Sequence, residues 1–443
     1  MARKKKKKKK INQYPERLVW LRVYNDRMLM TRCLTIGVLV LLFGVGLSAA
    51  SGLHVGKGLA YSSILTAVEQ AQPGDTVWIH EGLYSEGNIA INKPIALIGI
   101  GYPILDGLHN CEIITVNASD VLIQGLEIRN SGQLSTIDLA GIKVLSSDRV
   151  RIIGNKVLDC TFGIYLSNTN DCLVSKNSVS GIIKEEQNSG NGIHLWKCAR
   201  AVVEENHLTG QRDGIYFEFV TDSEIRYNHS EYNLRYGLHF MFSHNDHYHH
   251  NRFHHNGAGV AVMYSRQVKM TENEFGYNWG SSAYGLLLKD ISDSHIWKNI
   301  FEHNSAGVYM EGASRITLEQ NQFRENGWAL RVQASCDANI VRQNNFFGNT
   351  FDVSTNGSLV LNSFESNYWD RYEGYDLNHD GIGDVPFRPV SLYAVVVERM
   401  PFGLMLMRSF MVYLLDKAEK IIPSLTPEML KDDKPFMKPI ALL

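Results

Sequence analysis

Histidine and methionine are concentrated in one short part of this sequence. The stretch Arg235–Asn256 holds seven of the chain's 16 histidines together with Met241, and Met263 follows it. Imidazole nitrogen and thioether sulfur are the ligands that a soft, thiophilic cation such as Cu(I) prefers. Only side chains that point the same way can share one ion, so this chemistry depends on the elements that carry the residues.

A second group of candidate ligands lies nearer the C-terminus. Asp376, Asn378 and Asp380 occupy the first, third and fifth places of a loop whose sixth place is glycine, and Asp384 occupies the ninth. This spacing matches the start of an EF-hand calcium loop, although Phe387 stands at the twelfth place, where such a loop has a bidentate glutamate. The spacing predicts a calcium site that holds the end of the fold against the C-terminal segment. The alternative is a calcium-free turn.

An internal repeat positions these residues. From residue 141 onward a small residue is followed by an asparagine at a constant offset, with a slip of one residue in the ninth pair. The small residues are Gly141, Gly163, Gly192, Gly214, Gly237, Gly259, Gly285, Gly307 and Ala329, and the asparagines are Asn155, Asn177, Asn206, Asn228, Asn251, Asn273, Asn299, Asn321 and Asn344. The coils are mostly 22 residues long, which is typical of a solenoid.

Within each coil the apolar residues alternate as they do in short strands, for example in Gly163–Leu166 and Cys172–Val174. Three short strands per coil, with no long amphipathic helix, predict an all-β fold, a right-handed parallel β-helix. The asparagines are expected to form an internal ladder that satisfies backbone groups at one bend, so we assign them no chemistry. Longer coils indicate loops at 184–190 and 278–283.

The repeat also divides the chain into segments. Residues 51–110 are predicted to hold an N-terminal cap and the first coils, with a short helix at Ser62–Ala71 covering the open end of the solenoid. Residues 111–366 hold the β-helix repeats, and 367–390 form an Asp/Asn/Gly-rich loop. Residues 391–443 are predicted to form a helical tail, whose methionines are either core filler or part of a docking surface.

The first 50 residues have the pattern of an export signal. The lysine run Lys4–Lys10 precedes an apolar stretch, Cys33–Ala50, that ends in small residues. This order is typical of a secretory signal peptide cleaved after Ala50, and the alternative is an uncleaved inner-membrane anchor. Because the chain has 44 basic and 46 acidic residues and its strongest basic run lies in the signal, nucleic-acid binding is disfavoured.

Cysteine chemistry is not indicated. The chain has six cysteines without any C-x-x-C pair, and an odd number remains after residue 50. Such a pattern predicts neither a disulfide framework nor a zinc cluster. Buried thiols are the expected state of most of them.

Equivalent positions of successive coils form columns about 4.7–4.9 Å apart in a parallel β-helix. The first and third residues after each repeat glycine are apolar, so the second and fourth are expected to face outward. These positions put His239 and Met241 on one face with Met263 of the next coil and with His194 of an earlier coil. We predict that His194, His239, Met241 and Met263 bind copper transiently, as Cu(I). The same face also suits docking of a protein.

The other histidines of the stretch fall on other faces. His247 and His249 take outward positions before Asn251, and His229 or His303 would join them from neighbouring coils. A second, histidine-only site and a solvated surface are both open interpretations of this group.

Three stretches of the sequence resemble a known family. They are Pro73–Val77 with Gly82–Tyr84, then Arg235–Met241, then Asn367–Asp370 running through Asp380–Pro386 to Arg388–Pro389, and the tail ends in Pro435–Pro439. The repeat alone resembles the carbohydrate-binding and sugar-hydrolase β-helix superfamily, which includes pectinases and epimerases. The three stretches in this order are similar to its non-enzymatic periplasmic branch, the NosD family of nitrous oxide reductase maturation factors.

This resemblance implies a periplasmic protein that works with an ABC transporter, and with a copper chaperone, to assemble the copper-sulfide centre of nitrous oxide reductase. It implies contact with the membrane through the transporter. It also implies that the chain is not an enzyme.

Two other interpretations stay open. A metal-free scaffold that docks the transporter to the reductase fits the long solenoid and the tail. A polysaccharide lyase or epimerase would need clustered carboxylates, for which Glu218 with Asp213, near His239, is the best candidate set. This column offers no second acid at a convincing spacing, so the enzyme ranks last.

Overall fold

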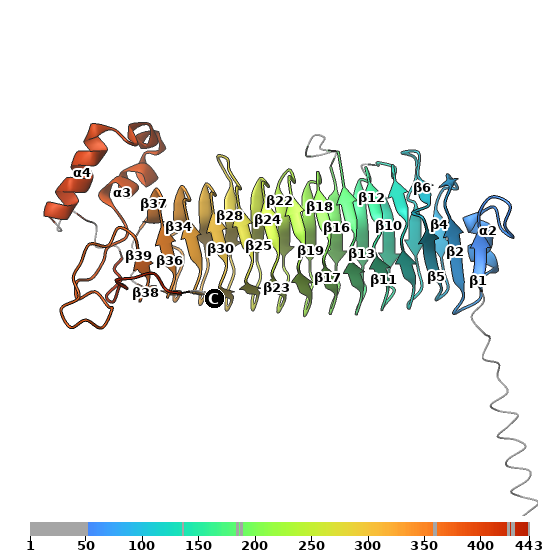
Figure 1. Ribbon diagram of the computed structural model, residues 1–443, viewed down its shortest axis with the longest axis horizontal. Coiled ribbons are helices and arrows are strands. Elements are labelled where there is room, and N and C mark those ends of the chain that lie inside the picture. The colour runs from blue at the N-terminus through green and yellow to red at the C-terminus, as the bar shows by residue number, and fades with distance from the viewer. Residues whose placement is uncertain are drawn as a thin grey trace, which may run out of the picture. The chain divides into compact units, whose positions relative to one another are not determined.

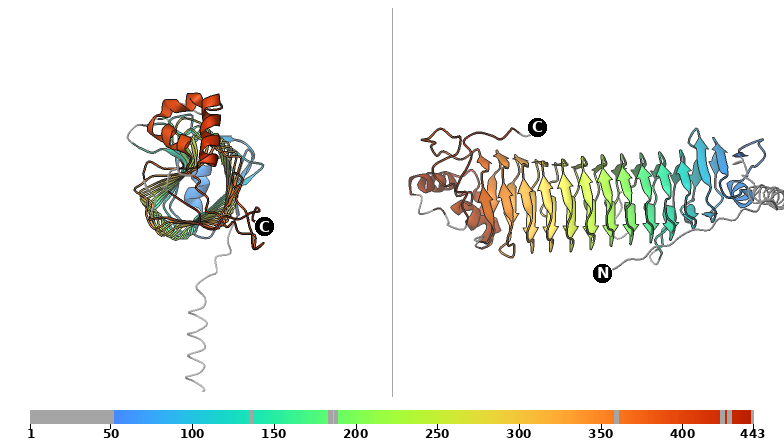
Figure 2. Two further views of the ribbon diagram at one scale, coloured as in Figure 1. Left: turned by 90° about the vertical axis from the view of Figure 1, so that its left-hand side faces the viewer. Right: turned by 90° about the horizontal axis from the view of Figure 1, so that it is seen from below.

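The chain folds into a stack of short parallel strands. The computed structural model describes residues 52–134, 137–182, 186, 189–357, 361–422, 426 and 430–441. Successive coils contribute strands to three parallel sheets of 14, 13 and 12 strands, here called sheets A, B and C. Figure 1 shows the stack from the side, and Figure 2 shows it from two further directions. The predicted right-handed parallel β-helix is confirmed.

Sheet A consists of β1 (Gly52–Val55), β2 (Thr76–His80), β5 (Ala96–Ile100), β8 (Leu122–Gln124), β11 (Arg151–Ile153), β14 (Leu173–Ser175), β17 (Val202–Glu204), β20 (Glu224–Arg226), β23 (His247–His249), β26 (Lys269–Thr271), β29 (His295–Trp297), β32 (Thr317–Glu319), β35 (Ile340–Arg342) and β38 (Ser363–Glu365). Sheet B consists of β3 (Leu83–Tyr84), β6 (Ile104–Asp106), β9 (Glu127–Arg129), β12 (Lys156–Leu158), β15 (Ser178–Ser180), β18 (His207–Thr209), β21 (His229–Glu231), β24 (Arg252–His254), β27 (Glu274–Gly276), β30 (Ile300–Glu302), β33 (Gln322–Arg324), β36 (Asn345–Phe347) and β39 (Tyr368–Trp369). Sheet C consists of β4 (Ile89–Ile91), β7 (Ile114–Val116), β10 (Ala140–Leu145), β13 (Phe162–Ser167), β16 (Asn191–Trp196), β19 (Asp213–Glu218), β22 (Tyr236–Met241), β25 (Ala258–Met263), β28 (Tyr284–Lys289), β31 (Ala306–Glu311), β34 (Trp328–Val332) and β37 (Phe351–Ser354). The helices are α2 (Ile64–Gln70), α3 (Leu392–Arg399), the 3-10 helix η2 (Pro401–Leu406) and α4 (Phe410–Ile421).

Columns of like side chains fill the interior. Six rings of sheet B stack in consecutive coils, with neighbouring centroids between 4.1 and 5.6 Å apart, and belong to Phe253, Phe275, Phe301, Phe323, Phe346 and Trp369. The repeat glycines leave room for this column. A β-carbon at Gly237 would lie 2.9 Å from Phe253 and 2.7 Å from the carbonyl oxygen of Gly259. Any side chain there would therefore push the rings or the next coil away.

The repeat asparagines form the predicted ladder, which runs along the bend between sheets A and B. The Asn251 side-chain oxygen, for example, accepts hydrogen bonds from the backbone NH and the side-chain NH2 of Asn228, at 3.0 and 2.9 Å. Its own NH2 group donates to the carbonyl of Ile225 at 2.9 Å. The same bonding links each coil to the next from Asn155 to Asn367. The prediction that these asparagines are structural is confirmed.

A second ladder, which we did not predict, runs along the bend between sheets B and C. It begins at Gln211 and continues through Asn233, Asn256, Asn278, Asn304, Asn326 and Asn349. These side chains are buried and again accept from the backbone NH of the coil before. In the coils from Gln211 to Asn349, side-chain amides thus fix two of the three bends.

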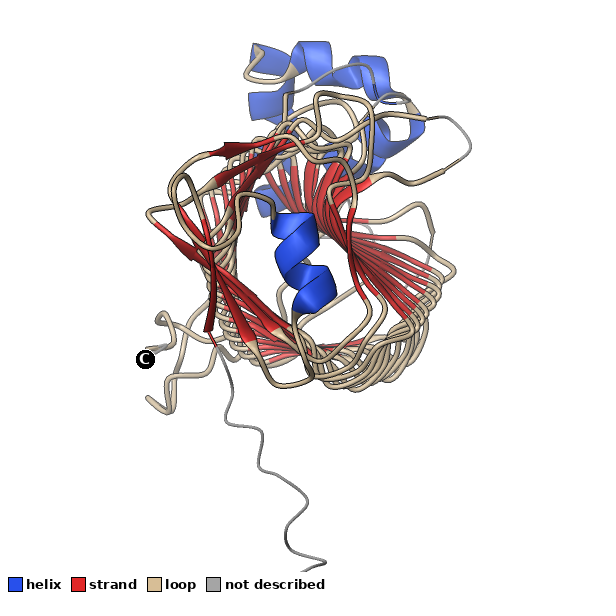
Figure 3. Ribbon diagram, turned by 90° about the vertical axis from the view of Figure 1, so that its right-hand side faces the viewer, coloured by secondary structure: helices blue, strands red, loops and turns tan. Residues whose placement is uncertain are grey.

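A helix covers the N-terminal end of the interior, within the range expected for it. Figure 3 shows α2 lying across the opening that the three sheets enclose. Ser63 caps it by accepting from the NH of Thr66, and the Glu86 carboxylate accepts from the NH groups of Ile64 and Leu65, each at 2.9 Å. The helix dipole and two orphan NH groups are therefore satisfied by a residue of the first coils.

An aspartate from the tail closes the opposite end of the first ladder. The buried Asp432 carboxylate accepts from the backbone NH groups of Ser366 and Asn367, from Asn367 Nδ2 and from Trp369 Nε1, at 3.0–3.1 Å. Its backbone exchanges hydrogen bonds with Phe387 at 2.8 and 2.9 Å. Asp432 thus takes the place of the asparagine that a further coil would supply.

The C-terminal helices rest on the last coil through a small apolar contact. Tyr393, Ala394 and Val397 of α3 form a cluster with Phe351 of β37, and the rings of Tyr393 and Phe351 lie 5.6 Å apart. The N-terminal segment with its predicted signal, and part of the predicted loop at 184–190, lie outside the described residues. No helix of the described ranges is long and apolar enough to cross a membrane.

Replacing Asp432 by alanine is expected to loosen the C-terminal end of the solenoid, because five donors, the Lys434 NH among them, lose their acceptor at once. A buried donor left without a partner costs about 1–3 kcal/mol, so hydrogen exchange at the Ser366 and Asn367 amides should speed up at least about tenfold. The matched control is Asp433→Ala, at an exposed neighbour, which should leave both amides protected. Unchanged exchange in the Asp432 variant would contradict the closing role of this residue.

Candidate metal-binding face

The two outward columns of sheet C are in the register that the sequence predicts. One contains Tyr165, His194, Tyr216, His239, Ala261, Leu287 and Tyr309, and the other contains Ser167, Trp196, Glu218, Met241, Met263, Lys289 and Glu311. Each residue of a column is the register partner of the column residues in the coils before and after it. Ligand-type side chains of neighbouring coils are therefore about one strand spacing, 4.7–4.9 Å, apart at the backbone.

Met241 and Met263 are direct partners in this register. Both side chains are half-buried, and the Tyr216 hydroxyl donates to the Met241 sulfur at 3.7 Å. Glu218 precedes the pair in its column and Lys289 follows it. The two thioethers thus form a soft, apolar patch between an acidic and a basic residue.

His239 lies on the same strand as Met241 and is held by a buried carboxylate. Its Nδ1 atom is 3.5 Å from Asp213, which also accepts from Arg235 at 3.0 and 2.6 Å. Burial alone would raise the pKa of Asp213, but the hydrogen bonds from His239 and Arg235 outweigh it, so the pKa is lowered and the group stays ionised. Both ring nitrogens of His239 are buried and, within the described part of the chain, make no hydrogen bond of good geometry; Nδ1 faces Asp213 and Nε2 faces no polar partner. A carboxylate on Nδ1 with Nε2 free is the arrangement that orients metal-binding histidines.

His194 does not join the other three predicted ligands. Tyr216 stands between His194 and His239, with ring centroids 4.7 Å from the first and 4.8 Å from the second. Burial lowers the pKa of His194 to about 3, and the nearby Arg212 guanidinium acts in the same direction. The imidazole is therefore one ring of an aromatic column. The ladder spacing puts His194 two coils from His239, so His194 is separated from the other three residues. Copper binding by His239, Met241 and Met263 stays a prediction.

The carboxylates considered for a polysaccharide enzyme are not paired. Asp213 begins β19 and Glu218 ends it, which separates their backbones by about 17 Å at roughly 3.3 Å per residue. Asp213 is also fully committed to Arg235 and His239. This geometry differs from the closely spaced acids that glycoside chemistry uses.

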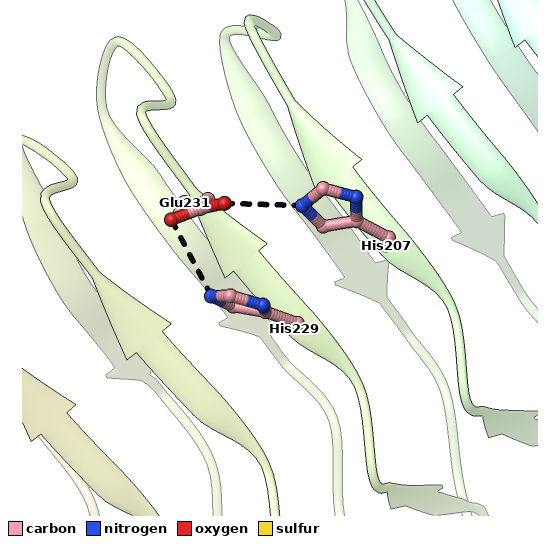
Figure 4. Close-up of side chains that lie close together, drawn as sticks. All are labelled: His207, His229 and Glu231. Atoms are coloured by element: carbon pink, nitrogen blue, oxygen red, sulfur yellow. Dashed lines mark hydrogen bonds and ion pairs between the residues drawn. The ribbon is translucent and has the colours of Figure 1, made fainter.

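Two clusters of histidine and glutamate lie on the other sheets, and we predicted neither as a complete set. On sheet B the ligand atoms of His207, His229 and Glu231 lie within 4.8 Å of one another, as Figure 4 shows. On sheet A the same holds for Glu224, His247 and His249. The sequence signal is weak because each cluster joins residues of two coils that lie about one repeat apart.

The predicted calcium loop uses its side-chain oxygens on its own backbone. Asp376 accepts from the NH groups of Asp380 and Gly381 at 3.2 and 2.8 Å, and Asp384 accepts from that of Leu377 at 2.7 Å. The loop also holds the tail, since Met437 donates to the carbonyl of Gly381 at 3.0 Å. Asp376, Asn378, Asp380 and Asp384 therefore shape a stable turn, and calcium binding stays a prediction.

The C-terminal helices carry a large exposed apolar surface. We call it the tail surface, and its most exposed members are Met400, Phe402, Met405, Phe410, Met411, Tyr413 and Ile421, each at least 56% exposed. The tail methionines Met400, Met405, Met407 and Met411 are all exposed and are thus not core filler. Large exposed apolar patches mark sites of protein or membrane contact.

The described cysteines carry no metal or disulfide chemistry of their own. Cys111, Cys160, Cys172, Cys198 and Cys336 are unpaired, and all but Cys111 are buried. Burial raises the pKa of Cys160 to about 12, so this thiol stays protonated and unreactive.

Part of the chain is similar to known proteins. A family described as "NosD: Periplasmic copper-binding protein (NosD)" matches residues 180–374. A protein of Pseudomonas aeruginosa named "Probable ABC transporter binding protein NosD" is 29% identical over 176 residues, covering 37% of this chain and 41% of that protein. A protein of Stutzerimonas stutzeri with the same name is 27% identical over 165 residues, covering 37% of this chain and 38% of that protein. The chain thus spans less than half the length of these relatives.

Solved structures share the fold. The Streptococcus pneumoniae surface protein and adhesin PfbA superposes with a TM-score of 0.55 at 14% identity, over 66% of this chain and 94% of that chain. The Yersinia enterocolitica family 28 exopolygalacturonase gives a TM-score of 0.55 at 10% identity, over 71% and 78%. At such identities the likeness concerns the β-helix alone. Over residues 180–374 the chain is similar to the NosD family, which is the family that its motifs resemble.

Proposed function

We propose that this protein is a periplasmic accessory factor that handles copper while the copper-sulfide centre of nitrous oxide reductase is assembled. The observation that carries the proposal is the in-register pair Met241 and Met263 beside His239. Copper is the cargo of this face rather than a resident cofactor. The protein itself is proposed to have no enzymatic activity, in keeping with relatives that are named binding proteins.

The ligand set suits temporary binding of Cu(I). Two thioethers and one imidazole are soft or borderline ligands without charge, so they select Cu(I) over hard cations. The Asp213 carboxylate lies 3.5 Å from His239 Nδ1, and a proton placed there would leave the Nε2 lone pair for the ion. Because Met241 and Met263 are only half-buried, a partner that offers stronger ligands has access to the ion.

The tail surface is proposed to dock the protein on an ABC transporter in the membrane. The transporter appears in the names of both curated relatives, and the exposed side chains of η2 and α4 supply the apolar area that such a contact needs. Nitrous oxide reductase and a copper chaperone are the proposed partners of the copper-handling face.

A metal-free scaffold is the second candidate function. The tail surface favours it, because docking the transporter to the reductase requires exposed apolar area and no metal ligands. A polysaccharide lyase or epimerase is less favoured, since Asp213 and Glu218 stand at opposite ends of β19.

Conversion of both methionines to leucine is expected to weaken Cu(I) binding at least about tenfold, because it removes two of three ligands while keeping the side-chain volume. The measurement is an anaerobic titration of the full chain with Cu(I) against a competing chelator. Met405→Leu, at an exposed methionine of the tail, is the matched control and should bind as the wild type does. If Met241→Leu/Met263→Leu binds Cu(I) as tightly as the wild type, the copper-handling face is wrong and the scaffold is favoured.

A charge in the tail surface is expected to abolish docking. Phe402→Asp with Met405→Asp should remove co-purification with the co-expressed transporter, because each carboxylate would be desolvated at the contact. The control is Ile182→Asp, at an exposed apolar residue of the β-helix. Equal recovery of the transporter with both variants would argue against docking through the tail.

Calcium in the Asp376–Asp384 loop is proposed to stabilise the C-terminal end. Added Ca2+ should then raise the unfolding temperature of the wild type by preferential binding to the folded state. The variant Asp376→Asn/Asp380→Asn should lack this shift. A wild type that is indifferent to Ca2+ and to a chelator would leave the loop as a calcium-free turn.

A further inference from the structure

The outer face of sheet B carries a three-residue cluster that the proposed copper face does not use. His207 of β18 is the register partner of His229 in β21, and Glu231 follows two residues later on the same face of that strand. Figure 4 shows the Glu231 carboxylate between the two imidazoles. Its Oε1 atom is 3.1 Å from His207 Nε2, and its Oε2 atom is 3.4 Å from His229 Nε2.

These distances fit the coordination shell of a small cation. Bonds of about 2.0–2.1 Å in a tetrahedral shell put neighbouring ligand atoms about 3.3–3.4 Å apart. The two nitrogen-to-oxygen distances bracket that value, and all three ligand atoms lie within 4.8 Å of one another. Small rotations of the side chains of His207 and His229 would therefore bring both nitrogens to an ion on the carboxylate.

The ligand atoms of this cluster are not committed to other groups. Among the described residues, Glu231 pairs with His207 and His229 and with no arginine or lysine. The His229 Nε2 atom is shielded from solvent and lacks a hydrogen bond of good geometry within the same residues.

The cluster on sheet A differs in this respect. Glu224 is held by Arg226 at 2.8 Å and by His249 at 2.9 Å. His247 is hydrogen-bonded to the Thr271 hydroxyl at 2.8 Å. Its three candidate ligands are therefore already bound to other side chains. The cluster on sheet A can thus serve as a control for the cluster on sheet B.

We propose that His207, His229 and Glu231 bind one divalent cation of the borderline class, Zn2+ or Cu2+. Two imidazole nitrogens and a carboxylate oxygen suit these ions and not Cu(I), which prefers sulfur. The site lies on a different sheet from Met241 and Met263, so it does not rest on the proposed function.

The next coil places a third imidazole on the same face, with its Nε2 atom 3.9 Å from Glu274. His254 is the register partner of Glu231, and its ring centroid lies 6.2 Å from that of His229. Arg252, the register partner of His229, is bound to Glu274 at 2.7 Å. Its positive charge is thus directed to a carboxylate one coil further on and not to Glu231.

The test is equilibrium dialysis of the metal-free full chain against Zn2+ and, separately, against Cu2+. Wild type should bind one ion that His229→Gln and Glu231→Gln each bind at least about tenfold more weakly, since even residues that only support ligands are worth about 10–100-fold. The Cu2+-loaded wild type should show nitrogen hyperfine splitting in its electron paramagnetic resonance spectrum, and the His229 variant should lose part of it. Cu2+ should bind more tightly than Zn2+.

Three control variants make the outcome specific. His303→Gln removes an imidazole of similar exposure that faces a single glutamate, Glu325, at 3.6 Å, and it should bind as the wild type does. So should Glu224→Gln and Met241→Leu/Met263→Leu. The proposal is overturned if Glu231→Gln binds the ion as the wild type does, or if Glu224→Gln or the methionine variant loses it instead. A wild type that binds this divalent ion but does not bind Cu(I) would contradict the proposed function alone. Unfolding temperatures in the absence of metal verify that the variants fold.

Discussion

The register between coils is the constraint on which the rest of this structure depends. A parallel β-helix has bends where backbone NH groups point along the stack, and each of them needs an acceptor from the next coil. The ladder from Asn155 to Asn367 supplies that acceptor, and Asp432 supplies the last one. A slip of one residue would leave buried amides unpaired along the whole bend. The coils are therefore held in a single register, which also fixes which outward side chains are neighbours.

The positions of the candidate metal ligands on the surface follow from this fixed register. Ligand-type residues become neighbours wherever two adjacent coils carry them at the same position. Met241 and Met263 meet in this way on sheet C, and His207 and His229 meet on sheet B. The inner columns are filled by stacked rings such as Phe275 and Phe301, so the two faces are held on one rigid body without sharing a ligand.

The sequence was sufficient for the coil and for the outward columns, because glycine and asparagine recur at constant spacing and strands alternate strictly. The sequence did not predict which side chains of those outward columns are buried. His194 and His239 occupy outward positions, yet tyrosines of neighbouring coils and the Asp213–Arg235 pair cover them. The second ladder follows the first by five residues in seven coils, as with Asn228 and Asn233. This regular spacing is visible in the sequence and would have predicted the second ladder.

Two other features could not be foreseen, for different reasons. The Glu231 cluster needs side-chain positions across two coils and one specific rotamer of a glutamate, which spacing does not encode. Asp432 lies far along the chain from Asn367, in a tail without periodicity, so only the folded structure shows that it completes the ladder.

The central claim is that an in-register thioether pair carries the copper. Anomalous diffraction at the copper edge, from crystals of the full chain loaded anaerobically with Cu(I), tests it most directly. We predict one anomalous peak between the sulfur atoms of Met241 and Met263, within bonding distance of both. A peak elsewhere with none at this pair, or no peak at all, would contradict it.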